Sequence, residues 1–166
     1  MTASDLEENA RAYAQLLGLQ VDFGTPLGYG NDGTVWQTMQ RTAVKAIERE
    51  SKYRTELACY QRFAEDGVEQ IDGFAVPELV GHNDELLVIE MTIVTPPYII
   101  DFAKVWLDKP PDYPEDSAAD RLRQAEEDFG ADWGAVAGLL WTLKTRFGIH
   151  YVDPNPGNIK LRGDSA

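Results

Sequence analysis

Cysteine and histidine are scarce in this sequence, and their scarcity excludes several kinds of site. The chain contains one cysteine, Cys59, and two histidines, His82 and His150. A single cysteine excludes a disulfide within the chain and any metal site built from several cysteines, and it is compatible with a reducing compartment. His82 lies in a polar segment with no second histidine nearby, so we interpret it as a surface residue.

Long hydrophobic runs are also missing. Met1 is followed by polar and acidic residues, without the basic segment and apolar run of a signal peptide. No stretch reaches the roughly 20 apolar residues that a membrane-spanning helix needs. The sequence therefore predicts neither a signal peptide nor a membrane span, and we expect a cytoplasmic protein.

Positive charge is in short supply. Fifteen Lys and Arg residues stand against 28 Asp and Glu residues, which gives a net charge of -13. Such a chain repels DNA, RNA and anionic membranes, so we expect neither nucleic-acid nor membrane partners. The length of 166 residues and the hydrophobic content of 43% suit one domain with a sizeable core.

The first half of the chain predicts a helix followed by strands. Ser4 and Glu7 form a capping-box pattern before a helix over residues 4–17, and Gly18 supplies its stop. We assign residues 1–18 to an accessory helix. Alternating apolar residues then predict three consecutive antiparallel strands, over residues 19–23, 34–39 and 42–47.

A glycine-rich segment connects the first two of these strands. Residues 28–35 read GYGNDGTV, with glycines at 28, 30 and 33 and valine at 35. The segment runs from strand to strand and lacks a Gly-Lys-Ser/Thr ending, which excludes a dinucleotide fingerprint and a Walker loop. Glycines let backbone amides approach phosphate oxygens closely. The alternative is an ordinary hairpin turn, and Asp32 counts mildly against phosphate binding.

Lys45 is a charged residue in the middle of the apolar strand over residues 42–47. A lysine in a strand usually faces solvent. Here a helix follows over residues 51–65, and its Glu56 is able to reach back to Lys45. Such an ion pair would hold the ammonium in place for an anionic phosphate.

The segment HYVDPNPGNI, residues 150–159, contains an acid, two prolines and an asparagine in a short space. Pro154 and Pro156 fix φ and disfavour a helix, so a rigid loop is expected. Such a loop could place the carboxylate of Asp153 as a proton acceptor beside Asn158 as a metal ligand, as phosphoryl transfer requires. The alternative is a turn that joins a helix to a strand.

The remaining segments predict two more strands and two helices. The strands lie over residues 76–81 and 86–91, around a turn at residues 82–85. A proline-rich connector follows, then helices over residues 117–128 and 132–147; the second carries apolar residues at helical spacing and should be a core helix.

Four features in order resemble the protein-kinase-like superfamily, which includes protein kinases and aminoglycoside-type phosphotransferases. They are the G-x-G-x-x-G-x-V hairpin, the strand with Lys45, the helix with Glu56, and the D-x-x-x-x-N loop from Asp153 to Asn158. The resemblance implies an α+β fold. A five-stranded antiparallel N-lobe with one helix would occupy residues 19–94, and a small, truncated helical C-lobe residues 95–166, with ATP between them.

The resemblance also implies roles for individual residues. Asp153 would accept the proton of the substrate hydroxyl, Asn158 would bind Mg²⁺, and Glu56 would orient Lys45. Ile89 would take the gatekeeper position. The ATP contacts would come from Gly28, Gly30, Gly33, Val35 and Lys45, from the Glu90 carbonyl and from the Thr92 amide.

The sequence departs from the family pattern near its end. The sequence ends at Ala166, before the position of the Asp-Phe-Gly aspartate that binds metal in such enzymes. Asp164, next to Gly163, is typical of a turn. Tyr151 stands where the family usually has histidine. Three hypotheses follow: a minimal phosphotransferase with low turnover, a pseudokinase-like binding or scaffold module, or a domain whose C-lobe is completed by a partner or a second copy. A protein hydroxyl, a small-molecule hydroxyl and the absence of any acceptor are the three alternatives for the substrate.

Overall fold

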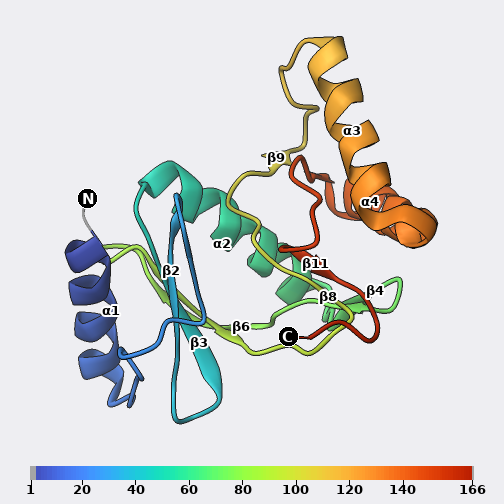
Figure 1. Cartoon of the computed structure of the whole chain (residues 1–166). Helices are drawn as coiled ribbons and strands as arrows, with labels where there is room; N and C mark the ends of the chain where they lie inside the picture. Colours follow the sequence, from blue (N-terminus) through green and yellow to red (C-terminus); the bar gives the residue numbers. More distant parts are fainter. Residues whose placement is uncertain (1–2, 166) are drawn as a thin grey trace. The chain divides into compact units, whose positions relative to one another are not determined.

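The computed structural model describes residues 3–165 and divides the chain into two compact units (Figure 1). The first unit comprises Met1–Ala64 and Pro77–Ile93, and the second comprises Glu65–Val76 and Val94–Ala166. The segment over residues 65–76 therefore groups with the second unit, although the sequence placed it in the N-lobe. None of the helices in the described part of the chain combines the length and apolar character needed to cross a membrane.

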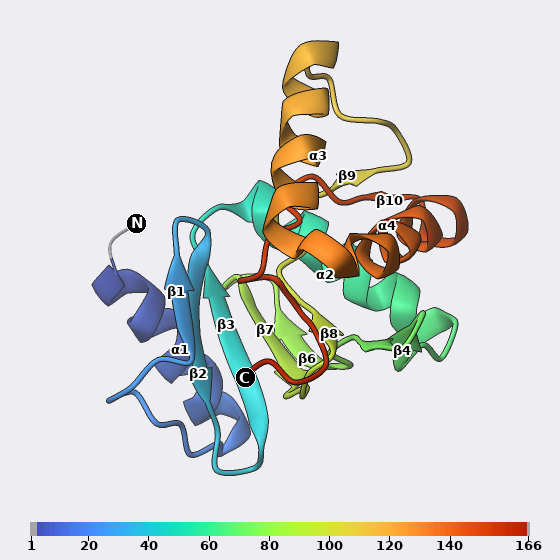
Figure 2. The same cartoon turned by 45° about the vertical axis from the view of Figure 1, so that its right-hand side comes forward.

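The first unit contains a five-stranded antiparallel sheet, as predicted (Figure 2). Its strands lie side by side in the order β1, β2, β3, β7, β6. Their bounds are Gly28–Gly30 for β1, Gly33–Gln37 for β2, Thr42–Ile47 for β3, Val88–Thr92 for β7 and Leu79–Asn83 for β6. Each neighbouring pair is antiparallel.

The prediction of a first strand over residues 19–23 was wrong. These residues contribute one isolated bridge, between Val21 and Thr38, and the edge strand β1 is formed by the glycine segment itself. The apolar alternation at residues 19–23 has a different cause, because Leu19, Val21 and Phe23 pack against the core cluster beneath α1. Packing on a helix and pairing in a sheet produce the same pattern here.

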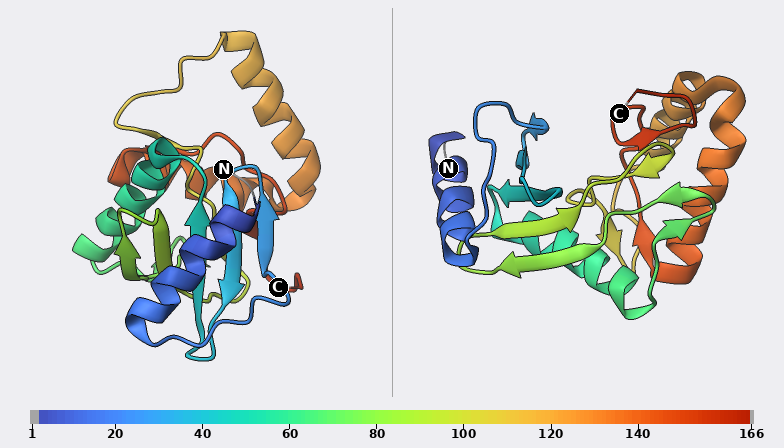
Figure 3. Two further views of the ribbon diagram at one scale, coloured as in Figure 1. Left: turned by 90° about the vertical axis from the view of Figure 1, so that its left-hand side faces the viewer. Right: turned by 90° about the horizontal axis from the view of Figure 1, so that it is seen from below.

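Helix α1, Ala3–Leu17, packs on the first unit and contributes to its core. It lies across the strands of the sheet (Figure 3, left panel). Its Leu6, Ala10 and Tyr13 are buried in one cluster with Trp36, Val44, Ala46 and Val88 from three strands. Burial of this apolar surface couples the helix to the sheet.

Helix α2, Glu50–Glu65, packs on the opposite face of the sheet. Val44 belongs to the cluster under α1, and successive side chains of a strand point to opposite faces, so Lys45 points away from α1. Lys45 contacts α2 on that side. The buried residues of α2 are Tyr53, Glu56, Leu57, Cys59, Tyr60 and Phe63.

A buried carboxylate connects α1 to the sheet. Glu90 is 4% exposed and accepts hydrogen bonds from the Tyr13 hydroxyl, at 3.1 Å, and from the Thr42 hydroxyl, at 2.6 Å. Burial, followed by the charge of Glu90, raises the pKa of Tyr13 above its ordinary value of 10.0. The folded state therefore holds Tyr13 neutral as a donor.

We expect Tyr13→Phe to lower the free energy of unfolding by about 1 to 2 kcal/mol, since a hydrogen bond to a charged group is worth roughly that much and Glu90 keeps its bond from Thr42. The loss should be constant below pH 10 and should shrink above it. Above that pH the tyrosine of the unfolded wild type ionises, and this penalty falls on the wild type alone. Urea denaturation of both proteins at neutral and alkaline pH measures the difference; a loss that grows with pH would contradict this account.

The second unit combines short strands with two helices. A four-stranded sheet has the order β11, β8, β5, β4, in which only β5 and β8 pair in parallel, and β9 pairs with β10. The strands are β4 Gln70–Ile71, β5 Phe74–Ala75, β8 Tyr98–Ile99, β9 Trp106–Leu107, β10 Ile149–His150 and β11 Ile159–Lys160. The helices are α3, Glu115–Phe129, and α4, Trp133–Phe147, joined by a short 3₁₀ turn, Gly130–Asp132. The core role predicted for α4 is confirmed, because its Val136, Leu139, Leu143 and Phe147 are buried.

Candidate functional site

Lys45 and Glu56 form the ion pair that the sequence suggested. The Lys45 ammonium donates to both carboxylate oxygens of Glu56, at 2.9 and 2.7 Å. Lys45 is 7% exposed and Glu56 is 1% exposed. The Tyr60 hydroxyl, one helical turn beyond Glu56, donates to the same carboxylate at 3.3 Å. The ammonium is therefore held in one place on the face of the sheet that α2 covers.

The strand register places one residue from each of the other strands of this sheet in line with Lys45. One cross-strand row runs Gly28, Val35, Lys45, Ile89, His82. Residues that lie directly opposite one another in a sheet carry their side chains on the same face. In this row Val35 lies next to Lys45, and Gly28, which has no side chain, lies next to Val35. The row therefore runs from the ammonium to a bare stretch of backbone at the sheet edge.

The three glycines of the hairpin differ in what the fold requires of them. A Cβ on Gly33 would lie 2.3 Å from the backbone oxygen of Ala46, so packing excludes any larger residue there. A Cβ on Gly28 or Gly30 would meet nothing within 4 Å, and neither residue has a positive φ. The fold therefore requires glycine at position 33. It does not require glycine at positions 28 and 30, where the space beside the backbone is open.

Asp32, in the turn of this hairpin, is directed inward. Its side chain is buried, the residue being 7% exposed, and its carboxylate lies 4.0 Å from the Arg49 guanidinium. The Asp32 carbonyl also accepts a hydrogen bond from the Glu48 amide, at 3.1 Å. The negative charge that counted against phosphate binding is thus buried below the hairpin surface. Tyr29, in the same hairpin, is by contrast 85% exposed.

The two residues expected to bind adenine through their backbone are used inside the sheet. The Thr92 amide donates to the Glu78 carbonyl at 2.9 Å, and the Thr92 hydroxyl accepts from the Glu78 amide at 2.9 Å. Glu90 lies on β7 between two neighbours and pairs with Val44 on one side and Gly81 on the other. The assignment of the Thr92 amide to a ligand is therefore corrected, and we carry neither Glu90 nor Thr92 forward as a nucleotide contact. Ile89, the expected gatekeeper, is fully buried.

The loop from Asp153 to Asn158, in the second unit, is ordered by its own side chains. The carboxamides of Asn155 and Asn158 both donate to the Asp153 carbonyl, at 3.0 and 3.2 Å. The Gly157 amide donates to the Asn155 side-chain oxygen at 2.9 Å. The side-chain nitrogen of Asn158 faces the Asp153 carbonyl. The side-chain oxygen of Asn158, the atom that a metal would bind, therefore points away from that carbonyl. Asn155 has a structural role that the sequence did not single out.

Tyr151 and Asn158 attach this loop to the segment that contains Ile100. The Tyr151 hydroxyl donates to the Ile100 carbonyl at 2.6 Å, and its ring packs edge-on against Phe102 at 5.7 Å. The Asn158 carbonyl accepts from the Ile100 amide at 2.9 Å. Tyr151 thus anchors the loop to the segment that contains Ile100 and Phe102. His150 lies in β10, and burial followed by the charge of Lys144 lowers its pKa.

Lys104 is a residue near Asp153 that the sequence did not reveal. Its ammonium lies 3.7 Å from a carboxylate oxygen of Asp153, and both side chains are 42% exposed. At this separation and exposure the pair contributes at most about 1 kcal/mol to stability. Lys104 is the only cation in the segment over residues 98–107, and that isolation was the available signal.

Comparison with known proteins gives one kind of match. The sequence matches no family model and no curated protein. Among solved structures, the chain is similar to APH(2'')-IIa in its ternary complex with streptomycin and ATP. The TM-score is 0.42 and the sequence identity 12%, over 82% of this chain and 40% of that chain. The chain thus spans less than half the length of that aminoglycoside phosphotransferase.

The side chains near Asn158 suit only one kind of metal site. Within residues 3–165, no three His, Cys, Asp or Glu side chains converge as a metal site would require. Mg²⁺ commonly keeps several waters and takes one or two protein oxygens together with substrate phosphates. The Asn158 oxygen fits such a shared site. Asp164 is committed to a turn, as expected, because its carboxylate accepts from the Leu161 amide at 2.7 Å.

Proposed function

We propose that this chain binds ATP through the Lys45 face of its first unit and transfers the γ-phosphoryl group to a hydroxyl acceptor. The observation that carries the proposal is the buried ammonium of Lys45, clamped by Glu56 on the same sheet face as Gly28 and Gly30. A buried ion pair stabilises a protein little compared with packed hydrophobic residues, because desolvation offsets its attraction. The ammonium is better explained by a ligand that it binds.

A triphosphate suits this arrangement. The chain has a net charge of -13, so an anion needs a local cation fixed against the general repulsion. Lys45 supplies that cation. The bare backbone at Gly28 and Gly30 allows phosphate oxygens to approach amide groups without a Cβ in the way.

The loop of the second unit supplies the groups for transfer. Asp153 would accept the proton from the acceptor hydroxyl as its oxygen bonds to the γ-phosphorus, while the bond to the β,γ-bridging oxygen breaks and ADP leaves. Asn158 would hold Mg²⁺ through its side-chain oxygen. A metal bound there with the phosphates would neutralise their developing charge. Lys104, whose ammonium lies 3.7 Å from the Asp153 carboxylate, adds a cation beside the proposed base within the second unit.

The alternative is a binding module that holds ATP without transferring phosphate. It shares Lys45, Glu56 and the glycine hairpin with the proposed enzyme and differs only in the use of Asp153 and Asn158. Binding and turnover must therefore be measured separately. A wild type that binds ATP but transfers no phosphate would favour the binding module.

Two glycines that face each other in the hairpin, Gly30 and Gly33, provide a matched test of binding. Gly30→Ala should leave the free energy of unfolding within about 0.5 kcal/mol of the wild type, because its methyl group meets open space. The same methyl group should obstruct the approach of phosphate and weaken ATP affinity by about tenfold, or about 1.4 kcal/mol. Gly33→Ala should cost about 1 to 3 kcal/mol of stability because of its clash with the backbone.

Calorimetric titration with ATP and urea denaturation separate these effects. The expected pattern is normal stability with weakened binding for Gly30→Ala, and lowered stability for Gly33→Ala. Unchanged ATP affinity in Gly30→Ala would contradict the role of the hairpin as a phosphate cradle.

A further inference from the structure

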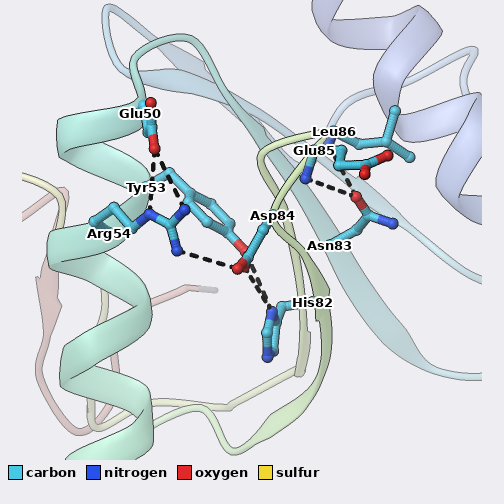
Figure 4. Close-up of polar contacts among 8 residues, drawn as sticks. All are labelled: Glu50, Tyr53, Arg54, His82, Asn83, Asp84, Glu85 and Leu86. Carbon is cyan, nitrogen blue, oxygen red and sulfur yellow. Dashed lines mark hydrogen bonds and ion pairs between the residues drawn. The ribbon is translucent and has the colours of Figure 1, made fainter.

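The turn between β6 and β7 contacts α2 at a point separate from the Lys45–Glu56 pair (Figure 4). The Tyr53 hydroxyl donates to one carboxylate oxygen of Asp84, at 2.6 Å. Arg54 donates to the other carboxylate oxygen, at 3.1 Å. Both oxygens of Asp84 are therefore engaged by consecutive residues of the helix.

A histidine and a second acid complete this cluster. His82 Nδ1 lies 3.2 Å from Asp84 Oδ1 and 3.2 Å from the Tyr53 hydroxyl. Arg54 also contacts Glu50, one turn earlier on α2, at 3.3 Å. The hydrogen bond from the Tyr53 hydroxyl, followed by the hydrogen bond and charge of Arg54, lowers the pKa of Asp84, which favours its ionised form.

The turn that carries Asp84 is itself well fixed. The Asn83 side-chain oxygen accepts from the amides of Glu85 and Leu86, at 3.0 and 2.9 Å (Figure 4). The Leu87 carbonyl accepts from the Ile47 amide of β3 at 2.9 Å. The turn can therefore act as a fixed support, and what it contacts on α2 is held in register with the sheet.

The two polar contacts of α2 fall on one cross-strand row. His82 and Lys45 belong to the same row, separated by Ile89. On the helix, Tyr53 and Glu56 are three residues apart and thus lie on one face. The helix is therefore attached at two points, with Tyr53 at the β6–β7 turn and Glu56 at β3. Two points of attachment restrain the rotation of α2 about its own axis more than a single ion pair would.

We propose that Asp84 is a positioning residue that docks α2 on the sheet and so keeps Glu56 paired with Lys45. Tyr53 is fully buried, so loss of Asp84 deprives an inward-facing hydroxyl of its main acceptor. The amino-terminal half of α2 then undocks more readily, and the Glu56 carboxylate moves with it. The consequence for ATP rests on the function proposed above, whereas the docking itself does not.

Cys59 provides a built-in probe of this docking. It is the only cysteine of the chain, it is fully buried, and it lies on α2 three residues after Glu56. A thiol reagent reaches it only when α2 opens locally or when the whole unit unfolds. The two routes differ, because local opening exposes little surface and so depends only weakly on urea.

The experiment compares Asp84→Ala and Tyr53→Phe with a control, Glu50→Gln, which alters a contact of Arg54 but none of Asp84. Cys59 labelling by a small aromatic disulfide is followed at several urea concentrations below the unfolding transition, without nucleotide. We expect labelling at least tenfold faster in Asp84→Ala and Tyr53→Phe, with a shallow urea dependence, and less than twofold faster in Glu50→Gln. Labelling that follows global unfolding, with the same steep urea dependence in all variants, would overturn the proposal.

Titration of the same variants with ATP adds a readout that a merely structural contact would not move. Asp84→Ala should weaken ATP affinity several-fold, and Glu50→Gln should leave it unchanged. If the wild type fails to bind ATP while the labelling pattern appears as expected, the docking role stands and the proposed function fails. If ATP binds normally and Asp84→Ala changes neither binding nor labelling, the docking role fails alone.

Discussion

Replacement of Lys45 by alanine is expected to lower the free energy of unfolding by about 3 to 5 kcal/mol. The substitution leaves the Glu56 carboxylate, 1% exposed, without the cation that holds it. The hydrogen bond from the Tyr60 hydroxyl, at 3.3 Å, is long and does not replace the charge of Lys45. A loss of this size is a large fraction of the stability of a small domain.

A double variant separates this structural cost from the loss of the ligand contact. Lys45→Met with Glu56→Gln keeps the volume of both side chains and removes both charges, so most of the stability should return. Urea denaturation of the wild type, Lys45→Ala and the double variant provides the comparison. Equal stability of Lys45→Ala and the wild type would contradict the burial of this pair.

Asp153→Asn is expected to reduce the rate of phosphate transfer from ATP by about 10² to 10⁴, the usual contribution of a general base. Asparagine retains the shape of the side chain but cannot accept the proton. Asp153 is 42% exposed in its side chain and its contact with Lys104 is 3.7 Å, so stability should change little. ATP affinity should also change little, because Lys45 and the glycine hairpin are intact.

Transfer from γ-labelled ATP to protein, small-molecule alcohols and water measures this effect. Lys104→Met is the comparison variant, and it should reduce transfer less than Asp153→Asn does. Transfer that survives Asp153→Asn unchanged would contradict the assignment of Asp153 as the base. ATP binding without transfer in the wild type would favour the binding module.

The parts of the fold that the sequence predicted are those with strong local periodicity. Helix α2 and strand β3 were predicted to within one residue, and their pairing of Lys45 with Glu56 followed from the expected return of the helix to the sheet. Helix α4 was predicted in the same way, by apolar residues at helical spacing.

The parts that the sequence did not predict depend on contacts between distant segments. The two-residue strands β4, β5, β8 and β11 are too short to show a period. β4 and β5 pair locally, but β5 with β8 and β8 with β11 pair across many residues. Residues 19–23 alternate like a strand yet pack against the cluster under α1. The bond from Tyr13 of α1 to Glu90 was not visible in the sequence, because it joins residues 77 positions apart.

The candidate site shows the same division. Local motifs predicted the glycine hairpin and the Asp153 loop, which is held by hydrogen bonds from Asn155 and Asn158 to the Asp153 carbonyl. Lys104 and the contact of Asp84 with Tyr53 arise from segments that meet only in the folded chain. The expected adenine contact at Thr92 failed because a backbone hydrogen bond to Glu78 is not visible in the sequence.

Calorimetric titration of ATP into the wild type and the Lys45→Met/Glu56→Gln double variant tests whether the Lys45 face binds ATP. Both proteins should be folded, so a difference reports the site alone. We expect the wild type to bind ATP, more strongly with Mg²⁺, and the double variant not to bind it. Absence of binding by the folded wild type, or equal binding by both proteins, would contradict this expectation.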